Sequence, residues 1–261
     1  MANGKSLALV TGASSGIGRA YARRLAGLGY DLIVVGRRQD RLDELAHECA
    51  NVAIRPIAVD LGGHAGIETV AGLCAAQSLT MLVNNAGVAH YMGFAQLPAD
   101  KAGELLHVKV LAPTLLARAA VPGMLARGVG TIVNVAGMLA FGGPAPLGPA
   151  AGRATYVASL AHLVAFSQAL HVELSDKGLR VQALCPGIVA TEFHERQGMD
   201  LSALPRMAEE DVVTASLRGL ELGEVVCAPG VERKELLEAV FVADLAAFGG
   251  QSPQLATRYS G

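Results

Sequence analysis

Apolar and polar positions follow a strand-like pattern in some segments of this chain and a helical pattern in others, and the two kinds of segment alternate. Short runs rich in Val, Ile and Leu indicate buried strands at 7–10, 31–36, 53–59, 81–83, 131–135, 179–184 and 225–227. Between them, apolar residues recur at helical spacing over 19–28, 40–50, 66–77, 100–126, 155–177, 209–222 and 232–248. Strands that alternate with helices predict an α/β fold, a doubly wound parallel sheet with helices on both faces.

The same pattern bears on domain organisation. No linker divides the sequence, so we expect one domain over residues 1–261. Within it, the segment 188–210, whose middle is polar and irregular, is expected to be a substrate lid, and 211–261 a C-terminal cap. The long helix over 100–126 is expected to be interrupted at Pro113.

The first strand runs into a turn of small residues that a helical segment follows at once. Here Gly12 permits a sharp turn, Gly16 lets the backbone approach a pyrophosphate, and Gly18 lets the helix pack on the strand. Three glycines alone are also compatible with a simple tight loop, but the strand before and the helix after favour a Rossmann-like dinucleotide site. The residues expected to bind the cofactor here are Gly12, Ser14, Ser15, Gly16, Ile17 and Gly18.

The ends of the next two strands carry further candidate ligands for a dinucleotide. Arg37 and Arg38 follow the second strand, where a carboxylate would bind ribose hydroxyls and an arginine accommodates a 2′-phosphate. Because Gly36 and Arg37 supply no carboxylate, NADP(H) is favoured over NAD; alternatively, both arginines form the solvated start of a helix. Asp60, followed by Leu61, either bonds an adenine amino group or caps the next helix.

Composition excludes some classes of function. The chain is 52% hydrophobic and 17% charged, which is typical of a globular protein. A net charge of -2 and the absence of Trp disfavour a nucleic-acid partner. No apolar run approaches the roughly 20 residues of a membrane helix and nothing resembles a signal peptide, so we expect no membrane partner and a cytoplasmic location. The four scattered cysteines lack metal-ligand spacing; we expect reduced thiols and no metal.

Four motifs in this order resemble those of short-chain dehydrogenases/reductases: the turn at 11–18, Asn84-Asn85-Ala86-Gly87, Tyr156 opening a long helix, and Pro186-Gly187. The resemblance covers residues 5 to about 195 closely. It implies hydride transfer between NAD(P)H and a carbonyl or alcohol, with a tyrosine as general acid/base, a serine that orients the carbonyl, a lysine four residues after the tyrosine, and an asparagine that supports the lysine. It also implies a homodimer or homotetramer packed through the helices at 100–126 and 155–177. The further cofactor contacts that it implies are Asn85, Ala86, Gly87, Tyr156, Pro186, Gly187, Ile188 and Thr191.

Three of the four catalytic positions differ from the family pattern. Tyr156 is present, but the lysine position is Leu160, the serine position Gly137 and the asparagine position Lys109. A free tyrosine, with a pKa of about 10, is a poor proton shuttle at neutral pH unless a positive charge lies beside it. We hypothesise that the Lys109 ammonium stands near Tyr156 in the space vacated at Leu160; alternatively, Lys109 snorkels out along its helix. Tyr156 and Lys109 are therefore the candidate catalytic residues.

The preferred interpretation is an NADP(H)-dependent oxidoreductase that reduces a carbonyl of a moderately large apolar substrate, because every cofactor-binding motif is retained. The expected pocket segments, 90–97, 138–154 and 188–208, are rich in Ala, Gly and Pro and carry few charges. Two alternatives stay open. One is a non-redox isomerase, cyclase or dehydratase with structural NADP, which the loss of serine and lysine suits; the other is a dinucleotide-binding pseudoenzyme.

Overall fold

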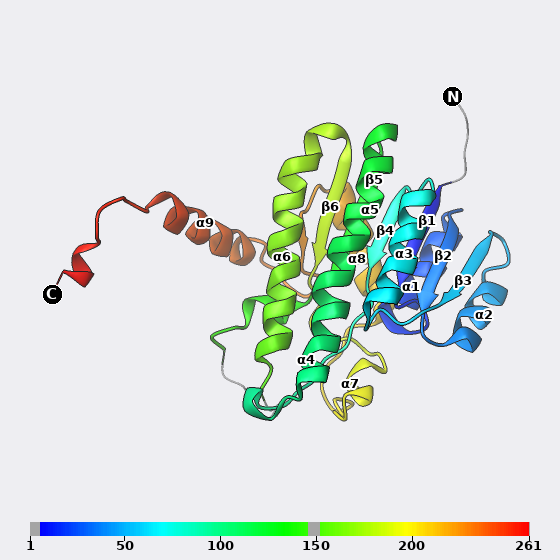
Figure 1. Ribbon diagram of the computed structural model, residues 1–261, viewed down its shortest axis with the longest axis horizontal. Coiled ribbons are helices and arrows are strands. Elements are labelled where there is room, and N and C mark those ends of the chain that lie inside the picture. The colour runs from blue at the N-terminus through cyan, green and yellow to red at the C-terminus, as the bar shows by residue number, and fades with distance from the viewer. Residues whose placement is uncertain (1–5, 146–151, 261) are drawn as a thin grey trace. The chain divides into compact units, whose positions relative to one another are not determined.

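A seven-stranded parallel sheet forms the centre of the structure, a computed structural model that describes residues 6–145 and 152–260 (Figure 1). The strand order is β3-β2-β1-β4-β5-β6-β7. The chain leaves β1 towards β2 and β3 and then crosses back to β4, so the switch point of the sheet lies between the carboxyl ends of β1 and β4. This confirms the expected doubly wound parallel sheet. The strands are β1 Leu7–Thr11, β2 Asp31–Gly36, β3 Ile54–Ala58, β4 Met81–Asn84, β5 Gly130–Val135, β6 Leu179–Leu184 and β7 Val226–Cys227.

The central strands are covered on both faces. Every residue of β4 and of β5 is buried, which explains why the sequence shows unbroken apolar runs there instead of alternation. By contrast, β3 lies at the edge of the sheet and contains Pro56, which has no N–H to donate to a further strand. The apolar runs thus predicted the strands, while their order in the sheet comes from the structure.

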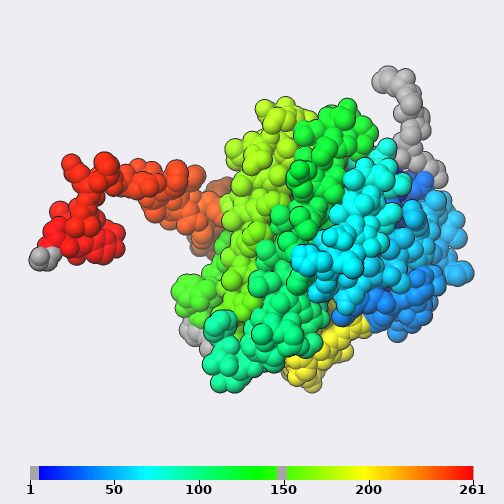
Figure 2. Space-filling view, viewed as in Figure 1, coloured from blue at the N-terminus to red at the C-terminus, as the bar shows by residue number. Residues whose placement is uncertain are grey.

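Helices form one layer on each face of the sheet. On one face, α1 Gly16–Gly27, α2 Gln39–Glu48 and α8 Glu209–Glu221 share a buried apolar cluster with the strands. The face turned to the viewer in Figures 1 and 2 is formed by α3 His64–Ala76, α5 Ala112–Arg127 and α6 Ala154–Leu174. On this face α3 contacts α5, and the shorter α4, Ala99–Leu106, contacts α6.

The long helix expected over 100–126 is interrupted, but by a π turn and at a different place from the predicted one. A single π-helical turn, His107–Leu111, separates α4 from α5, and Pro113 stands in the first turn of α5. Because the helical stretch Ala99–Arg127 is continuous, Pro113 removes an N–H that would otherwise pair with the Lys109 carbonyl four residues before it. The interruption predicted at Pro113 was therefore displaced: the irregularity lies just before it, around Lys109, and residues flanking a π turn are often functional.

Two helical stretches, Ala99–Arg127 and Ala154–Lys177, have the length and apolar character needed to cross a membrane. The sequence-based expectation that nothing approaches such a span was therefore too strict. Both stretches pack on the sheet through buried side chains such as Leu116 and Leu163, and core helices pass the same test of length and composition. The absence of a membrane partner stays a prediction.

The segment expected to be an irregular lid contains a short helix. Helix α7, Phe193–Arg196, follows β6, and an isolated parallel bridge joins Val189 to Met207. This bridge holds the two ends of the loop, at Val189 and Met207, next to each other. Its role as a lid stays a prediction.

The division in the C-terminal part does not fall at the expected start of the cap, residue 211. Residues up to Pro229 belong to one compact unit, which includes α8 and β7, and Gly230–Gly261 form a second unit. In that second unit, helix α9, Glu235–Gly249, contains no buried residue among those described. The compact units thus divide after Pro229, while the single domain over 1–261 with a C-terminal cap over 211–261 stays a prediction.

Candidate active site

One cavity of about 1050 Å³ opens at the carboxyl ends of the strands, where ligands bind in doubly wound sheets. It gathers all but one of the predicted site residues; Gly18 lies outside its lining. The predicted residues that line it are Gly12, Ser14, Ser15, Gly16, Ile17, Arg37, Arg38, Asp60, Leu61, Asn85, Ala86, Gly87, Lys109, Tyr156, Pro186, Gly187, Ile188 and Thr191. Among the described residues, no group of three or more His, Cys, Asp or Glu side chains could hold a metal ion.

The glycine turn after β1 is held in shape by the segment after β4. Gly12 has a φ of 67°, in the left-handed region that favours glycine. A Cβ on Gly18 would lie 2.4 Å from both the Gly12 carbonyl oxygen and the Asn85 amide nitrogen, so only glycine lets α1 start this close to β1. The Asn85 amide in turn donates hydrogen bonds to the carbonyl oxygens of Thr11 at 3.0 Å and Gly12 at 3.3 Å. The Asn85 side chain therefore braces the turn, and its backbone faces the cavity.

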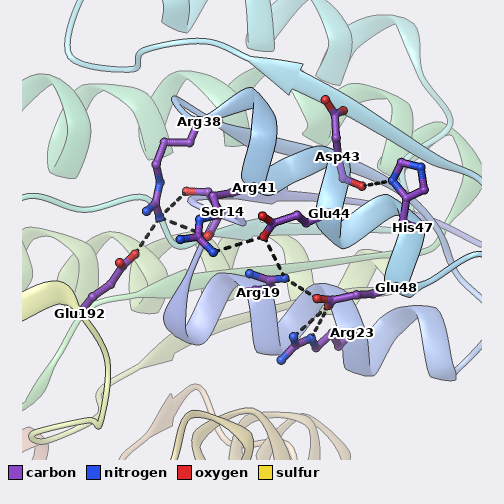
Figure 3. A network of polar contacts seen from close by, with 10 residues as sticks. All are labelled: Ser14, Arg19, Arg23, Arg38, Arg41, Asp43, Glu44, His47, Glu48 and Glu192. Atoms are coloured by element: carbon purple, nitrogen blue, oxygen red, sulfur yellow. Dashed lines mark hydrogen bonds and ion pairs between the residues drawn. The ribbon is translucent and has the colours of Figure 1, made fainter.

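Arg38 occupies the position expected for a 2′-phosphate ligand (Figure 3). Its guanidinium donates to both the carbonyl and the hydroxyl oxygen of Ser14, at 3.2 Å each, and to the Glu192 carboxylate at 2.7 Å. Burial alone would raise the pKa of Glu192, but hydrogen bonds from Arg38 and Ser15 and the nearby charge of Arg196 lower it to about 2. In this structure the Glu192 carboxylate thus takes the place that an anionic ligand would have beside Arg38.

The two other sequence-based alternatives for the nucleotide end are now distinguished in part. The Asp60 carboxylate accepts a hydrogen bond from the Gly62 backbone at 2.9 Å, so it shapes the loop after β3 while it lines the cavity. Arg37 is half-exposed, and its guanidinium lies 3.8 Å from the Glu104 carboxylate. Both arginines border the cavity, and Arg38 is also the N-cap residue of α2, so both alternatives for the two arginines stay open.

Tyr156, in the first turn of α6, presents the phenol to the same cavity. Its side chain is 8% exposed, and the ring packs edge-to-face with Tyr91 at 5.6 Å between ring centres. Burial, and a hydrogen bond that Tyr156 donates to Tyr91, raise the pKa of Tyr156 far above its ordinary value. In this state Tyr156 holds its proton and can act as an acid, but it cannot become a phenolate without help.

Lys109 is buried and does not snorkel to solvent. The residue is 4% exposed, and its ammonium donates a hydrogen bond of 3.0 Å to the Val135 carbonyl oxygen. Burial lowers the pKa of Lys109 to about 8. A Cβ on Gly87 would lie only 3.0 Å from the Lys109 Nζ, which places this ammonium beside the strand end of β4. The alternative of an exposed lysine is therefore wrong. Lys109 and Tyr156 line one cavity, and the hypothesis that the Lys109 ammonium stands near Tyr156 stays a prediction.

The positions where the family has its serine and its lysine are apolar. A Cβ on Gly137 would lie 3.5 Å from the Leu160 side chain, so the two altered positions are direct neighbours in the cavity wall. Leu160 itself is buried and lines the cavity. Of the expected pocket segments, 90–97 and 188–208 contribute lining residues, whereas 146–151 within 138–154 lie outside the described residues.

Sequence reasoning missed several residues that shape the cavity. Glu192 is 154 positions from Arg38, and no local pattern predicts their pairing. Phe193 packs near Tyr156 at 6.3 Å between ring centres, and its one available signal was an aromatic residue in an otherwise polar segment. The Glu104 carboxylate lies within ion-pair distance of three basic side chains that also line the cavity, Arg37, Lys101 and His90.

A glycine turn at the switch point of a doubly wound sheet, with a buried phenol on the same cavity, defines the class: oxidoreductases with a dinucleotide-binding fold. The family model for short chain dehydrogenases matches residues 6–201. The chain therefore belongs to the short-chain dehydrogenase/reductase family.

Individual relatives agree with this assignment. A short-chain dehydrogenase from Sphingobium yanoikuyae, solved in complex with NADPH, superposes with a TM-score of 0.91 at 34% identity, covering 97% of this chain and 100% of that one. A bulky-bulky ketone specific alcohol dehydrogenase from Comamonas testosteroni gives 0.88 at 31% identity over 97% and 98% of the two chains. A mouse very-long-chain 3-oxoacyl-CoA reductase is 31% identical over 231 residues, 84% of this chain and 71% of the relative.

Proposed function

We propose that this protein is an NADP(H)-dependent reductase of a carbonyl in a moderately large, apolar substrate. The observation that carries the proposal is that the glycine turn, Arg38 and Tyr156 all border one cavity. Such a cavity can accommodate a dinucleotide along the strand ends with room for a substrate beside Tyr156.

The nucleotide end of the cavity fits a phosphorylated ribose. Arg38 already binds one anion there, the Glu192 carboxylate, through a hydrogen bond of 2.7 Å. A 2′-phosphate would accept the same charge-assisted hydrogen bonds, while Arg37 stands close by with its guanidinium half-exposed. NADPH is bound in the similar Sphingobium structure, which supports the preference for NADP(H).

At the end of the cavity where the carbonyl would react, Tyr156 provides a proton donor and Lys109 provides a positive charge. Bound NADPH supplies the hydride that the carbonyl carbon accepts. Tyr156 donates its proton to the carbonyl oxygen, because burial keeps the phenol protonated at neutral pH. The negative charge then left on Tyr156 is stabilised by the Lys109 ammonium on the same cavity, which takes over part of the role of the missing family lysine.

The substrate class follows from the wall around Tyr156. Apolar side chains line it, including Met138, Leu139, Leu160 and Phe193. This favours a bulky or long apolar ketone over a small polar one. The names of two relatives, a bulky-bulky ketone specific alcohol dehydrogenase and a very-long-chain 3-oxoacyl-CoA reductase, support this choice.

We further propose that two or four copies assemble through the α4–α5 and α6 helices, in the cytoplasm. These helices carry exposed apolar side chains such as Leu106 and Val172, at 45% and 78% exposure. Light scattering of the purified protein tests the stoichiometry, and a monomer at micromolar concentration would contradict it.

The function itself is tested by cofactor titration and turnover. The chain contains no Trp, so nicotinamide fluorescence can be followed without an indole background. We expect NADPH to bind more tightly than NADH, and NADPH to be oxidised when bulky apolar ketones are added. Binding without oxidation across a ketone panel would support a non-redox enzyme or a pseudoenzyme instead. Failure to bind either dinucleotide would refute the assignment.

A further inference from the structure

Tyr156 has lost the serine hydroxyl and the lysine that share its task in the family, but a second phenol stands beside it. Tyr91 follows β4 in the chain and lines the same cavity. Its ring meets the Tyr156 ring edge-on, with 5.6 Å between ring centres and 69° between ring planes. Besides burial, the charge of Tyr91 and a side-chain hydrogen bond with Tyr91 raise the pKa of Tyr156. The reacting hydroxyl is thus held by another residue that can both accept and donate a proton.

The position of Tyr91 is fixed by aromatic packing. Its other neighbour is the imidazole of His194, stacked at 6.4 Å with 26° between the planes, while Phe193 packs against both His194 and Tyr156. Burial raises the pKa of Tyr91, whereas the hydrogen bond from Tyr156 and the charge of Arg153 act in the opposite direction. Tyr91 therefore stays protonated at neutral pH and keeps one proton to donate.

We propose that Tyr91 is a second catalytic hydroxyl, which holds the Tyr156 proton at rest and stabilises the Tyr156 oxygen once that proton has left. At rest Tyr91 accepts the Tyr156 hydrogen bond. In the reaction the carbonyl carbon gains the hydride of the reduced nicotinamide, which is oxidised, and the carbonyl oxygen gains the Tyr156 proton. The Tyr91 hydroxyl then rotates about its C–O bond and donates to the Tyr156 oxyanion, until Tyr156 recovers a proton from water.

The proposal accounts for how a site without a serine hydroxyl can work. A hydroxyl aimed at a developing oxyanion in a dry cavity contributes about 10²- to 10³-fold in rate. Gly137 has no hydroxyl, and it faces the apolar side chain of Leu160. The cavity wall at these two positions therefore cannot supply a hydroxyl to the oxyanion. Tyr91 acts on the Tyr156 oxygen, where the charge appears, and complements the more distant ammonium of Lys109. The role rests on the proposed reductase function for its effect on turnover, but the hydrogen bond between the two phenols does not.

Tyr91→Phe tests the proposal with the loss of one oxygen and no loss of ring packing. We expect kcat for ketone reduction to fall about 10²-fold, with KM and NADPH affinity within about threefold of the unaltered protein. Tyr30→Phe is the matched control, since Tyr30 packs against the core away from the cavity, and it should leave kcat unchanged. Melting temperatures of both variants check that folding is intact.

A second readout is independent of turnover. The chain has five tyrosines, so protein labelled with ¹³C at the ring carbon that bears the hydroxyl gives five resolvable NMR signals. Tyr91→Phe should shift the Tyr156 signal and leave the signals of Tyr21 and Tyr259 in place, whereas Tyr30→Phe should not move Tyr156. An unmoved Tyr156 signal, or a kcat within about twofold of the unaltered protein, overturns the proposal. If no ketone is reduced by the unaltered protein, the reductase function fails, and the NMR shift alone then decides whether Tyr91 controls the Tyr156 proton.

Discussion

Replacing Lys109 with Met should make the protein more stable and less active at the same time. The ammonium of Lys109 is buried at 4% exposure, with a hydrogen bond to one backbone carbonyl and, among the residues that the structure describes, no carboxylate paired with it. Burial lowers its pKa from 10.5 to about 8. One pKa unit corresponds to about 1.4 kcal/mol, so the charged side chain destabilises the fold by about 3 kcal/mol at neutral pH. Met, of similar length, removes that penalty.

The pH dependence has a definite sign. Between about pH 8 and 10.5 the unfolded chain binds a proton on Lys109 that the folded protein does not, so stability of the unaltered protein rises with pH in this window. The stability advantage of Lys109→Met is therefore largest below pH 8 and shrinks as the pH approaches 10.5. Urea unfolding at a series of pH values measures both effects.

Activity should change in the opposite direction. Without the ammonium, the oxyanion left on Tyr156 loses the positive charge proposed to stabilise it, and kcat for ketone reduction should fall about 10²-fold. Lys177→Met is the control, because Lys177 is an exposed lysine that should alter stability by under about 1 kcal/mol. A Lys109→Met variant with unchanged turnover, or with a stability difference independent of pH, would refute the reasoning.

Three further substitutions probe the remaining parts of the site. Tyr156→Phe should lower ketone reduction at least about 10²-fold while NADPH titration gives the same affinity, because the ring stays and the proton donor is lost. Arg38→Ala should weaken NADPH binding at least about tenfold and NADH binding little, as measured by nicotinamide fluorescence, since only NADPH carries the 2′-phosphate that the guanidinium is proposed to bind; equal losses for both would contradict its assigned place. Gly18→Ala should lower the free energy of unfolding by about 1–3 kcal/mol and weaken dinucleotide binding, because its Cβ would overlap the Gly12 carbonyl and the Asn85 amide. A Gly18→Ala protein with normal urea unfolding would show that the turn is looser than described.

The strands and the nucleotide end of the cavity were predictable because their determinants are local. A buried parallel strand needs an apolar run, and a sharp turn needs glycine at a defined spacing, so β2 and β6 fall at the predicted bounds and Gly12 has the left-handed φ expected of it. The altered family positions were equally visible, since Leu160 and Gly137 each replace one known residue type.

The features that depend on distant contacts could not be predicted. The partner of Arg38 is set by how the loop after β6 folds back, which brings Glu192 to it from far along the chain. The contact between Tyr91 and Tyr156 likewise joins a loop to a helix through ring packing alone. For Lys109 the sequence left a buried and a snorkelling side chain open, and the π turn around it was not predicted. The apolar helix α9 gave a strong helical pattern that says nothing about what it contacts.

The π turn at His107–Leu111 makes the electrostatics of the site depend on chain length as well as on residue identity. Such a turn inserts one residue into an α-helix. Deleting one residue there would restore regular winding: the bulge absorbs the extra residue, so α4 and α5 would keep roughly their relative rotation and only side chains within the turn would be redirected. An ammonium in the deleted turn would then point elsewhere, although no cavity residue had been replaced. A scan of point substitutions would not detect this dependence, whereas a single-codon deletion would.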